Sequence, residues 1–250
     1  MWMGLKARFW ISKWIKRLRF SFLLQKKKIY DIIIQAIATR REKVIKNVVF
    51  DFGRVLVRFD EPFIVSHYVS NPDDIALITK VVFDRLYWAP LDAGTISDEE
   101  VVRLSKERLP QRLWEAAEKS YYNWIYHIPL ITGMDKVVER VKRVHGRRIF
   151  LLSNISEYFA KRDGVVPILS LFEKKIYSGV CKMIKPQREM FEYLCDSCQI
   201  LPEETLFIDD SPINIAGAES FGIKGYLFDG DVEKLSKYLD KLFLVENFSK

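Results

Sequence analysis

The sequence has 250 residues, 49% of them hydrophobic, so the chain can bury one α/β core with an additional part. The formal net charge is +7, but residues 1–46 hold 13 Lys and Arg against two acidic residues, whereas the remainder is slightly acidic. Because the basic excess is confined to this N-terminal segment, we expect no nucleic-acid partner.

Residues 1–46 form a basic leader that is predicted to contain a short amphipathic helix. Basic residues lie opposite an apolar face made of Trp10, Ile11, Trp14, Ile15 and Leu18. The favoured interpretation is a helix docked on this domain or a partner, or a loosely ordered extension. Peripheral membrane contact is the alternative, because tryptophans beside basic residues suit an anionic membrane surface. Lys and Arg interrupt every apolar run, so we expect neither a transmembrane segment nor a signal peptide.

The three cysteines, Cys181, Cys195 and Cys198, are too few and too late in the chain for a disulfide framework. This usage favours a reducing compartment and predicts a cytoplasmic protein. Cys195 and Cys198 form a C-x-x-C pair, but on a helix they share an apolar face with Phe191 and Leu194. We therefore interpret both thiols as core residues rather than as metal or redox groups.

The first predicted strand ends in a carboxylate. The apolar run of residues 48–50 is typical of a buried strand, and Asp51 follows directly. Gly53 then gives a turn in which the backbone can approach a ligand. In open α/β sheets ligands bind outside the carboxyl ends of the strands. Asp51 is therefore a candidate for catalysis, with helix capping as the alternative.

Residues 61–128 show a helical pattern with no convincing strand and a break at residues 90–97. A helical insert placed after the first strand predicts a cap over the strand ends. Four of its side chains could face a substrate or form the cap's own core: Tyr87, Trp88, Asp92 and Trp124. The predicted organisation is a leader (1–46), an α/β core (47–60 and 129–250) and a helical cap (61–128).

Strand and helix patterns alternate after the insert. Thr132 and Asp135 have capping-box spacing before a helix whose apolar stripe runs from Met134 to Val144, and Gly146 ends it. Strands are predicted at residues 148–154, 175–180, 205–210 and 225–228, with Pro186 near the start of a helix. This alternation predicts a Rossmann-like parallel sheet with all carboxyl ends on one edge.

That edge collects four polar clusters, which are Asp51, Ser153 with Asn154, Lys185, and Asp209 with Asp210. They lie in the ordered motifs FDFGRV, LLSN, IKP and IDDSPIN. As an ordered set these motifs resemble the haloacid dehalogenase (HAD) superfamily. Their wording is similar to the subgroup that includes small sugar-phosphate phosphatases and the phosphatase domain of soluble epoxide hydrolase. The resemblance covers nearly everything but the leader and implies a HAD core with an inserted helical cap.

The resemblance implies a Mg²⁺-dependent phosphohydrolase acting on a small phosphorylated metabolite. A carboxylate can attack phosphorus and form an aspartyl-phosphate, and Asp51 takes that role. Mg²⁺ would bridge the two anions through hard oxygen ligands. Those ligands are implied to be Asp51, the backbone carbonyl of Gly53 and Asp210, with Asp209 and Asn214 in support.

The resemblance also assigns the groups that would bind the phosphoryl oxygens. Ser153 and the Asn154 amide would hold these oxygens, and Lys185 would offset their charge. A metal-free haloacid dehalogenase is the alternative enzyme, because it uses the same nucleophile and lysine. Such an enzyme has less need of the Asp209–Asp210 pair, so this pair favours the phosphatase.

One position departs from the family pattern. The family's phosphatases usually carry a second aspartate two residues after the nucleophile, which protonates the leaving group and then activates water. This chain has Gly53 there. Some members of the similar subgroup also have glycine, yet the departure supports a further alternative, a catalytically idle HAD-fold binding protein tethered by the leader. Candidate replacements, of which His67 is favoured, are Asp60, Asp92, His67, His127 and His145.

Overall fold

The computed structural model of the chain describes residues 44–247, which belong to one compact unit. The predicted amphipathic helix and membrane contact of the leader lie outside the described residues, apart from positions 44–46. Within the described part, no helix is both long and apolar enough to cross a membrane.

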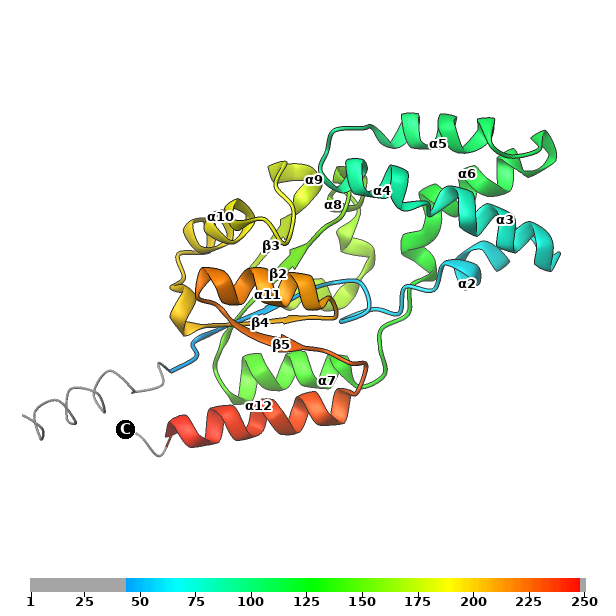
Figure 1. Cartoon of the computed structure of the whole chain (residues 1–250). Coiled ribbons are helices and arrows are strands. Elements are labelled where there is room, and N and C mark those ends of the chain that lie inside the picture. Colours follow the sequence, from blue (N-terminus) through cyan, green and yellow to red (C-terminus); the bar gives the residue numbers. More distant parts are fainter. Residues whose placement is uncertain (1–43, 248–250) are drawn as a thin grey trace, which may run out of the picture. The chain divides into compact units, whose positions relative to one another are not determined.

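Five parallel strands form one sheet in the order β3-β2-β1-β4-β5 (Figure 1). The strands are β1 (Asn47–Phe50), β2 (Arg148–Ser153), β3 (Lys174–Tyr177), β4 (Thr205–Asp209) and β5 (Lys224–Leu227). The central strand β1 pairs with β2 and β4, so Val48 lies between Ile149 and Leu206. The predicted Rossmann-like parallel sheet is therefore confirmed.

The helices fall into an inserted group and a group that flanks the sheet. The inserted group comprises α2 (Glu61–Ser66), α3 (Pro72–Val82), α4 (Arg85–Asp92), α5 (Asp98–Glu107), η1 (Gln111–Leu113), α6 (Trp114–Asn123) and η2 (Trp124–His127). The flanking group comprises α7 (Met134–Glu139), the π-helical turn η3 (Arg140–Val144), α8 (Glu157–Ala160), η4 (Asp163–Val165), η5 (Pro167–Leu171), α9 (Ser178–Cys181), α10 (Arg188–Cys198), η6 (Pro202–Glu204), α11 (Pro212–Phe221) and α12 (Val232–Asn247).

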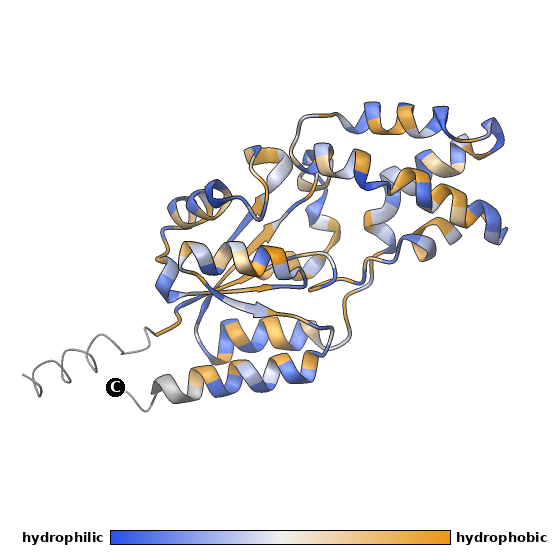
Figure 2. Ribbon diagram, viewed as in Figure 1, coloured by the Kyte–Doolittle hydropathy of each residue, from blue (hydrophilic) through white to orange (hydrophobic). Residues whose placement is uncertain are grey.

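The sheet is buried between two helical layers because successive strand residues point to opposite faces. Val48 and Phe50 pack into the cluster that contains α7 and α12, whereas Val49 packs into the cluster that contains α10 and α11. Figure 2 shows the corresponding apolar strands and inward-facing helix stripes. This three-layer packing fixes the carboxyl ends of the strands on one edge.

The inserted helices have a hydrophobic core of their own, which includes Ile78, Leu91 and Val101. An aromatic group connects this core to the sheet. The Phe59 ring lies 5.8 Å from that of Trp88 and 5.3 Å from that of Trp124, and Trp124 stacks on Phe159 at 5.6 Å. The insert therefore packs against the α/β core through aromatic side chains.

The insert leaves and rejoins the core through two paired segments. Val57 and Leu130 form an antiparallel bridge. The Arg58 N–H donates to the Pro129 carbonyl at 2.8 Å, and the Ile131 N–H donates to the Leu56 carbonyl at 2.9 Å. Both ends of the insert are thus fixed side by side next to the Asp51 loop.

Three sequence predictions about local structure are wrong. The strand predicted at residues 175–180 ends at Tyr177, because the chain turns there into α9. Thr132 does not cap α7; its N-cap is Gly133, whose φ of +87° suits glycine. The break predicted to begin at Pro90 begins later, since Pro90 lies inside α4.

The buried stripe predicted from Met134 to Val144 holds only as far as Val141. Val144 is 70% exposed. The helix changes to π-type geometry over η3, which places an extra residue in the turn and rotates Val144 away from the core. The stop at Gly146 is confirmed, as this residue has a φ of +62°.

Cys195 and Cys198 are buried among apolar side chains on α10, as predicted. Burial raises the pKa of Cys195 to about 12 and that of Cys198 to about 11. Thiols held in the neutral form are poor metal ligands and poor nucleophiles. These two residues therefore act as core packing.

Gly217 on α11 offers a test of this packing. A Cβ added there would lie 2.7 Å from the Pro186 carbonyl oxygen and 2.8 Å from the Pro186 Cβ. We expect Gly217→Ala to destabilise the protein by about 1–3 kcal/mol through overpacking, despite the better helix propensity of alanine. Urea unfolding measures this, with Gly164→Ala as control because nothing lies within 4 Å of its added Cβ. Equal midpoints for the two variants would contradict the prediction.

Candidate active site

Asp51 lies at the carboxyl end of the central strand, where the sheet itself positions it. Its N–H donates to the Ile208 carbonyl of β4 at 2.9 Å, so the backbone stays in the sheet up to this residue. The chain then folds into a tight loop in which the Arg54 N–H donates to the Val57 carbonyl at 2.8 Å. Asp51 is only 8% exposed and is held by a rigid backbone.

Lys185 is buried between two carboxylates. Its Nζ lies 2.8 Å from Asp51 Oδ1 and 2.7 Å from Asp209 Oδ2, and its side chain is 2% exposed. Burial alone lowers the pKa of a lysine, but the charges of Asp51 and Asp209 more than offset this and raise the pKa of Lys185. Lys185 is therefore a fixed cation.

Asn154 holds the backbone of Lys185. Its Oδ1 accepts from the Lys185 N–H and its Nδ2 donates to the Lys185 carbonyl, both at 2.9 Å. Ser153 directly precedes it at the end of β2 and is buried. The sequence predicts that Asn154 binds phosphate but does not predict its hydrogen bonds to the Lys185 backbone. No sequence pattern indicates that the loops of Asn154 and Lys185 are in contact.

Asp209 and Asp210 end β4 next to Asp51. Asp209 is fully buried; besides Lys185 it accepts from the Ser211 N–H at 2.8 Å and from Asn214 Nδ2 at 3.1 Å. Asp51, Asp209 and Asp210 each offer one carboxylate oxygen, and these oxygens lie within 4.8 Å of one another. Three carboxylates beside one ammonium have a formal net charge of −2. Their hard oxygen ligands therefore suit a divalent cation.

Burial and mutual repulsion raise the pKa values of two carboxyl groups in this cluster, Asp51 and Asp210. Burial raises the pKa of Asp51 to about 7; Lys185 opposes this effect and Asp209 adds to it. Burial and then the charge of Asp209 also raise the pKa of Asp210. Burial thus opposes the ionisation of both carboxyl groups, and a cation bound beside them would favour it.

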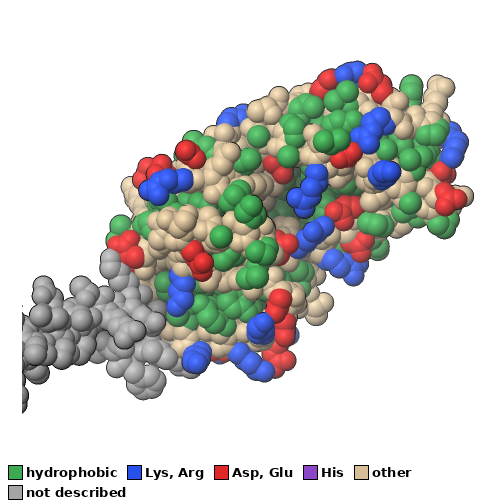
Figure 3. Space-filling view, viewed as in Figure 1, with side chains coloured by type: hydrophobic (Ala, Val, Ile, Leu, Met, Phe, Trp, Pro, Cys, Tyr) green, Lys and Arg blue, Asp and Glu red, His purple; other side chains and the backbone are tan. Residues whose placement is uncertain are grey.

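A cavity of about 440 Å³ opens over the carboxyl edge of the sheet. The core lines it with Gly53, Ser153, Asn154, Lys185, Asp210 and Asn214, which are most of the residues predicted for the site. The insert lines the opposite wall with residues that include Trp88, Asp92 and Trp124. Figure 3 shows the hollow between the two parts, with basic side chains beside it.

The four cap residues singled out in the sequence divide into two groups. Trp88, Asp92 and Trp124 line the cavity, whereas Tyr87 packs against the insert's own core with Arg108 over its ring. Sequence reasoning missed Arg54 and Arg85, which also line the cavity. Arg54 follows Gly53 directly, a position that could have identified it; Arg85 stands in no recognisable motif.

Of the five candidates for the missing acid, Asp92 is the one among the cavity-lining residues. His67 Nδ1 donates to the Phe63 carbonyl of its own helix, and its ring stacks on His127 at 3.8 Å. His145 lies 3.1 Å from Asp240. Asp60 caps α2 by accepting from the Phe63 N–H. The preference for His67 therefore has no support from the geometry.

A family comparison now identifies the class of protein. The family model of haloacid dehalogenase-like hydrolases matches residues 32–222, so the chain belongs to this family and the predicted resemblance is confirmed. The protein is a hydrolase of the HAD type, with the parallel core of that family.

Two relatives are 23% identical to the chain. A D-ribitol-5-phosphate phosphatase of Bacteroides thetaiotaomicron matches over 193 residues, which are 73% of this chain and 91% of that protein. A drimenol cyclase of Aspergillus calidoustus matches over 188 residues, which are 74% of this chain but only 34% of the cyclase. The chain thus spans nearly all of the first relative and about a third of the second.

Solved structures share the fold. A HAD-like hydrolase from Porphyromonas gingivalis has a TM-score of 0.59 at 24% identity, covering 78% of this chain and 98% of its own. A HAD-family enzyme from B. thetaiotaomicron, in complex with magnesium and inorganic phosphate, has a TM-score of 0.57 at 25% identity, covering 76% and 98%. The L-2-haloacid dehalogenase of Xanthobacter autotrophicus has a TM-score of 0.56 at 17% identity, covering 79% and 83%.

Lys185 is expected to be essential for stability when no metal is bound. Lys185→Met leaves Asp51 and Asp209 buried without their shared cation, which should cost about 3–5 kcal/mol in the free energy of unfolding. Urea unfolding at pH 8 in EDTA measures it. Lys119→Met, which removes an exposed pair with Glu115, is the control and should leave the midpoint almost unchanged. Similar midpoints for both variants would refute the prediction.

Asp92 should make stability depend on pH. Burial raises its pKa to about 7; Lys185 opposes this, Asp51 adds to it and Arg85 opposes it. A carboxyl whose pKa rises on folding stabilises the protein below its unfolded pKa, and that stability is lost as the pH rises through 7. Asp92→Asn should therefore raise the Tm at pH 8 in EDTA. The corresponding gain in the free energy of unfolding is at most about 4 kcal/mol. The gain should vanish near pH 4, and a gain independent of pH would be inconsistent with this explanation.

Proposed function

We propose that the protein is a Mg²⁺-dependent phosphatase that cleaves a small phosphorylated metabolite through an aspartyl-phosphate. The observation that carries this proposal is the cluster of Asp51, Asp209 and Asp210 carboxylates around buried Lys185, next to a cavity that Lys185 and Asp210 line. A carboxylate nucleophile next to a cation-binding group is the arrangement that attack on an anionic phosphate requires.

Asp51 is the proposed nucleophile. One of its carboxylate oxygens forms a bond to phosphorus while the bond from phosphorus to the leaving oxygen breaks. Lys185 holds Asp51 Oδ1 and offsets the charge of the phosphoryl oxygens as a fixed cation. Ser153 and Asn154, which line the cavity, are proposed to donate to these oxygens. The Asn154 side chain also positions Lys185.

The proposed Mg²⁺ ligands are Asp51, the Gly53 carbonyl and Asp210. A bound Mg²⁺ would neutralise charge between the nucleophile and the phosphoryl group. Asp209 and Asn214 are assigned a supporting role, because Asp209 is occupied by Lys185, Ser211 and Asn214. Residues 61–128 are proposed to cap the site formed by residues 47–60 and 129–250.

The substrate is proposed to be small, since the cavity holds about 440 Å³. The phosphatase relative acts on ribitol 5-phosphate, and the solved complex with magnesium and phosphate belongs to a protein of similar fold; both support a phosphate ester as substrate. The free state of Cys181, Cys195 and Cys198 supports a cytoplasmic setting. Peripheral membrane contact through residues 1–46 stays a proposal from its sequence pattern.

The metal-free dehalogenase is the second candidate. Its fold is shared, as the X. autotrophicus enzyme shows, but a fold common to both reactions does not choose between them. The group of Asp51, Asp209 and Asp210 beside one lysine favours the metal-dependent reaction, because a metal-free enzyme has less need of the Asp209–Asp210 pair. The idle binding protein takes its support from Gly53 alone.

Hydrolysis of p-nitrophenyl phosphate with and without Mg²⁺ tests the proposal. We expect turnover that requires Mg²⁺ and falls by about 10³-fold or more in Asp51→Asn, which lacks the anion. Beryllium fluoride with Mg²⁺ should form a complex on Asp51 that mimics the aspartyl-phosphate. The control is Asp196→Asn, on the exposed side of α10, which should keep wild-type rates. Metal-independent chloride release from 2-chloropropionate would favour the dehalogenase, and no reaction with either compound would favour the binding protein.

A further inference from the structure

We propose that Asp92, carried by the inserted helices, is the acid–base residue of the reaction and replaces the aspartate that the family pattern would place at position 53. This inference rests on the proposed phosphatase function. It assigns the proton donor to the wall of the cavity opposite the nucleophile.

One carboxylate oxygen of Asp92 is not used in a hydrogen bond within the described part of the protein. Its Oδ1 is buried and has no hydrogen-bond partner among the described residues. Leaving a buried carboxylate oxygen unpaired is unfavourable, and such groups are concentrated at functional sites. Asp92 lines the cavity, and the charges of Lys185 and Asp51 both act on it. An unpaired acid therefore lies within electrostatic range of the nucleophile.

The end of α4 directs Asp92 into this cavity. Leu91 lines a second cavity of about 570 Å³ on the other side of α4, while Asp92 lines the first. The chain after α4 is fixed by hydrogen bonds: the Ala93 N–H donates to the Ala89 carbonyl at 3.1 Å, and the Thr95 N–H donates to the Pro90 carbonyl at 2.9 Å. Neighbouring residues thus face opposite cavities.

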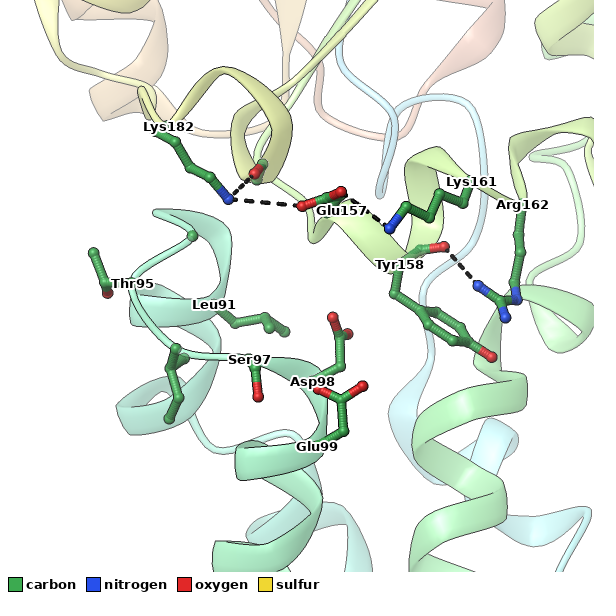
Figure 4. Close-up of a pocket in the computed structure, with 13 residues that line it drawn as sticks. Leu91, Thr95, Ser97, Asp98, Glu99, Glu157, Tyr158, Lys161, Arg162 and Lys182 are labelled. Atoms are coloured by element: carbon green, nitrogen blue, oxygen red, sulfur yellow. Dashed lines mark hydrogen bonds and ion pairs between the residues drawn. The ribbon is translucent and has the colours of Figure 1, made fainter.

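Contacts with the core hold this segment in place. Figure 4 shows the second cavity, in which the segment after Leu91 lies opposite Lys182 and Glu157. A Cβ added to Gly94 would overlap the end of the Lys182 side chain, so the backbone there lies against this side chain of the core. Lys182 donates to the Gly179 carbonyl and lies 3.9 Å from Glu157. Asp92 is therefore positioned by the core as well as by its own helix.

The environment also gives Asp92 suitable acidity. Its pKa of about 7 keeps the protonated and ionised forms both populated near neutral pH. A group of this kind can give a proton in one step and take one in the next.

As Asp51 bonds to phosphorus, the electron pair of the breaking bond goes to the leaving oxygen, which takes the proton of the Asp92 carboxyl and departs as an alcohol. In the second step the Asp92 carboxylate takes a proton from water while the water oxygen bonds to phosphorus. The electron pair of the bond between phosphorus and Asp51 returns to the Asp51 carboxylate. Inorganic phosphate leaves and Asp92 is protonated again.

Position 53 provides a direct rescue experiment. Nothing lies within 4 Å of a Cβ added to Gly53, and its φ is not in the left-handed region. The Cβ of an aspartate therefore meets no steric conflict there. Gly53→Asp should supply an acid from the core when Asp92 has been removed.

The test compares phosphate esters of graded leaving-group pKa: p-nitrophenyl phosphate, phenyl phosphate and ribitol 5-phosphate. In the wild type we expect kcat/KM to depend only weakly on this pKa. In Asp92→Asn, the rate for the poorest leaving group should fall by about 10²–10⁴-fold. With p-nitrophenyl phosphate the variant should release a burst of about one nitrophenolate per enzyme and then turn over slowly, because water lacks its base. Gly53→Asp in this variant should restore turnover.

Glu99→Gln is the matched control, since Glu99 lines the second cavity and not the first. It should keep wild-type kinetics. A wild type that hydrolyses these esters with a steep leaving-group dependence would overturn the assignment, and this measurement does not require the variant to fold. An Asp92→Asn variant with a raised KM, no burst and an equal loss for every ester would overturn it as well. A wild type without phosphatase activity would instead refute the proposed function.

Discussion

The contact on which the site depends is the buried ammonium of Lys185 between Asp51 and Asp209. Without it the buried carboxylates of Asp51 and Asp209 would lie close together with no cation between them. The lysine is in turn held by Asn154, whose side-chain amide fixes the Lys185 backbone from the neighbouring strand end. Three strands thus contribute to one charge cluster, and each depends on the sheet register for its place.

The protein balances the charge of this cluster only in part, because Lys185 is one cation beside three carboxyl groups. Asp209 is completely occupied by protein donors, whereas burial raises the pKa of Asp51 and Asp210. Asp209 therefore has a structural role in the site, whereas Asp51 and Asp210 are the carboxylates left for the proposed cation.

Most of the fold follows from sequence pattern, because buried parallel strands are continuous apolar runs that alternate with helices. The motif residues Asp51, Lys185 and Asp210 could be placed on one edge for the same reason. Asp92 could not be separated from its rivals, since the choice depends on how the insert packs on the core, and aromatic contacts of Phe59 and Trp124 decide that. Local errors had local causes: a π-helical turn moved Val144, and glycine replaced Thr132 as a cap.

The pairing of Val57 with Leu130 has a consequence for how such a protein diversifies. Because the insert begins and ends at adjacent points, its length and sequence can change while the path of the core chain stays the same. Where the reacting groups all lie in the core, such an exchange alters specificity and keeps the chemistry. With Asp92 on the insert, the exchange would remove a reacting group together with the substrate pocket, and the two parts of this protein must therefore evolve together.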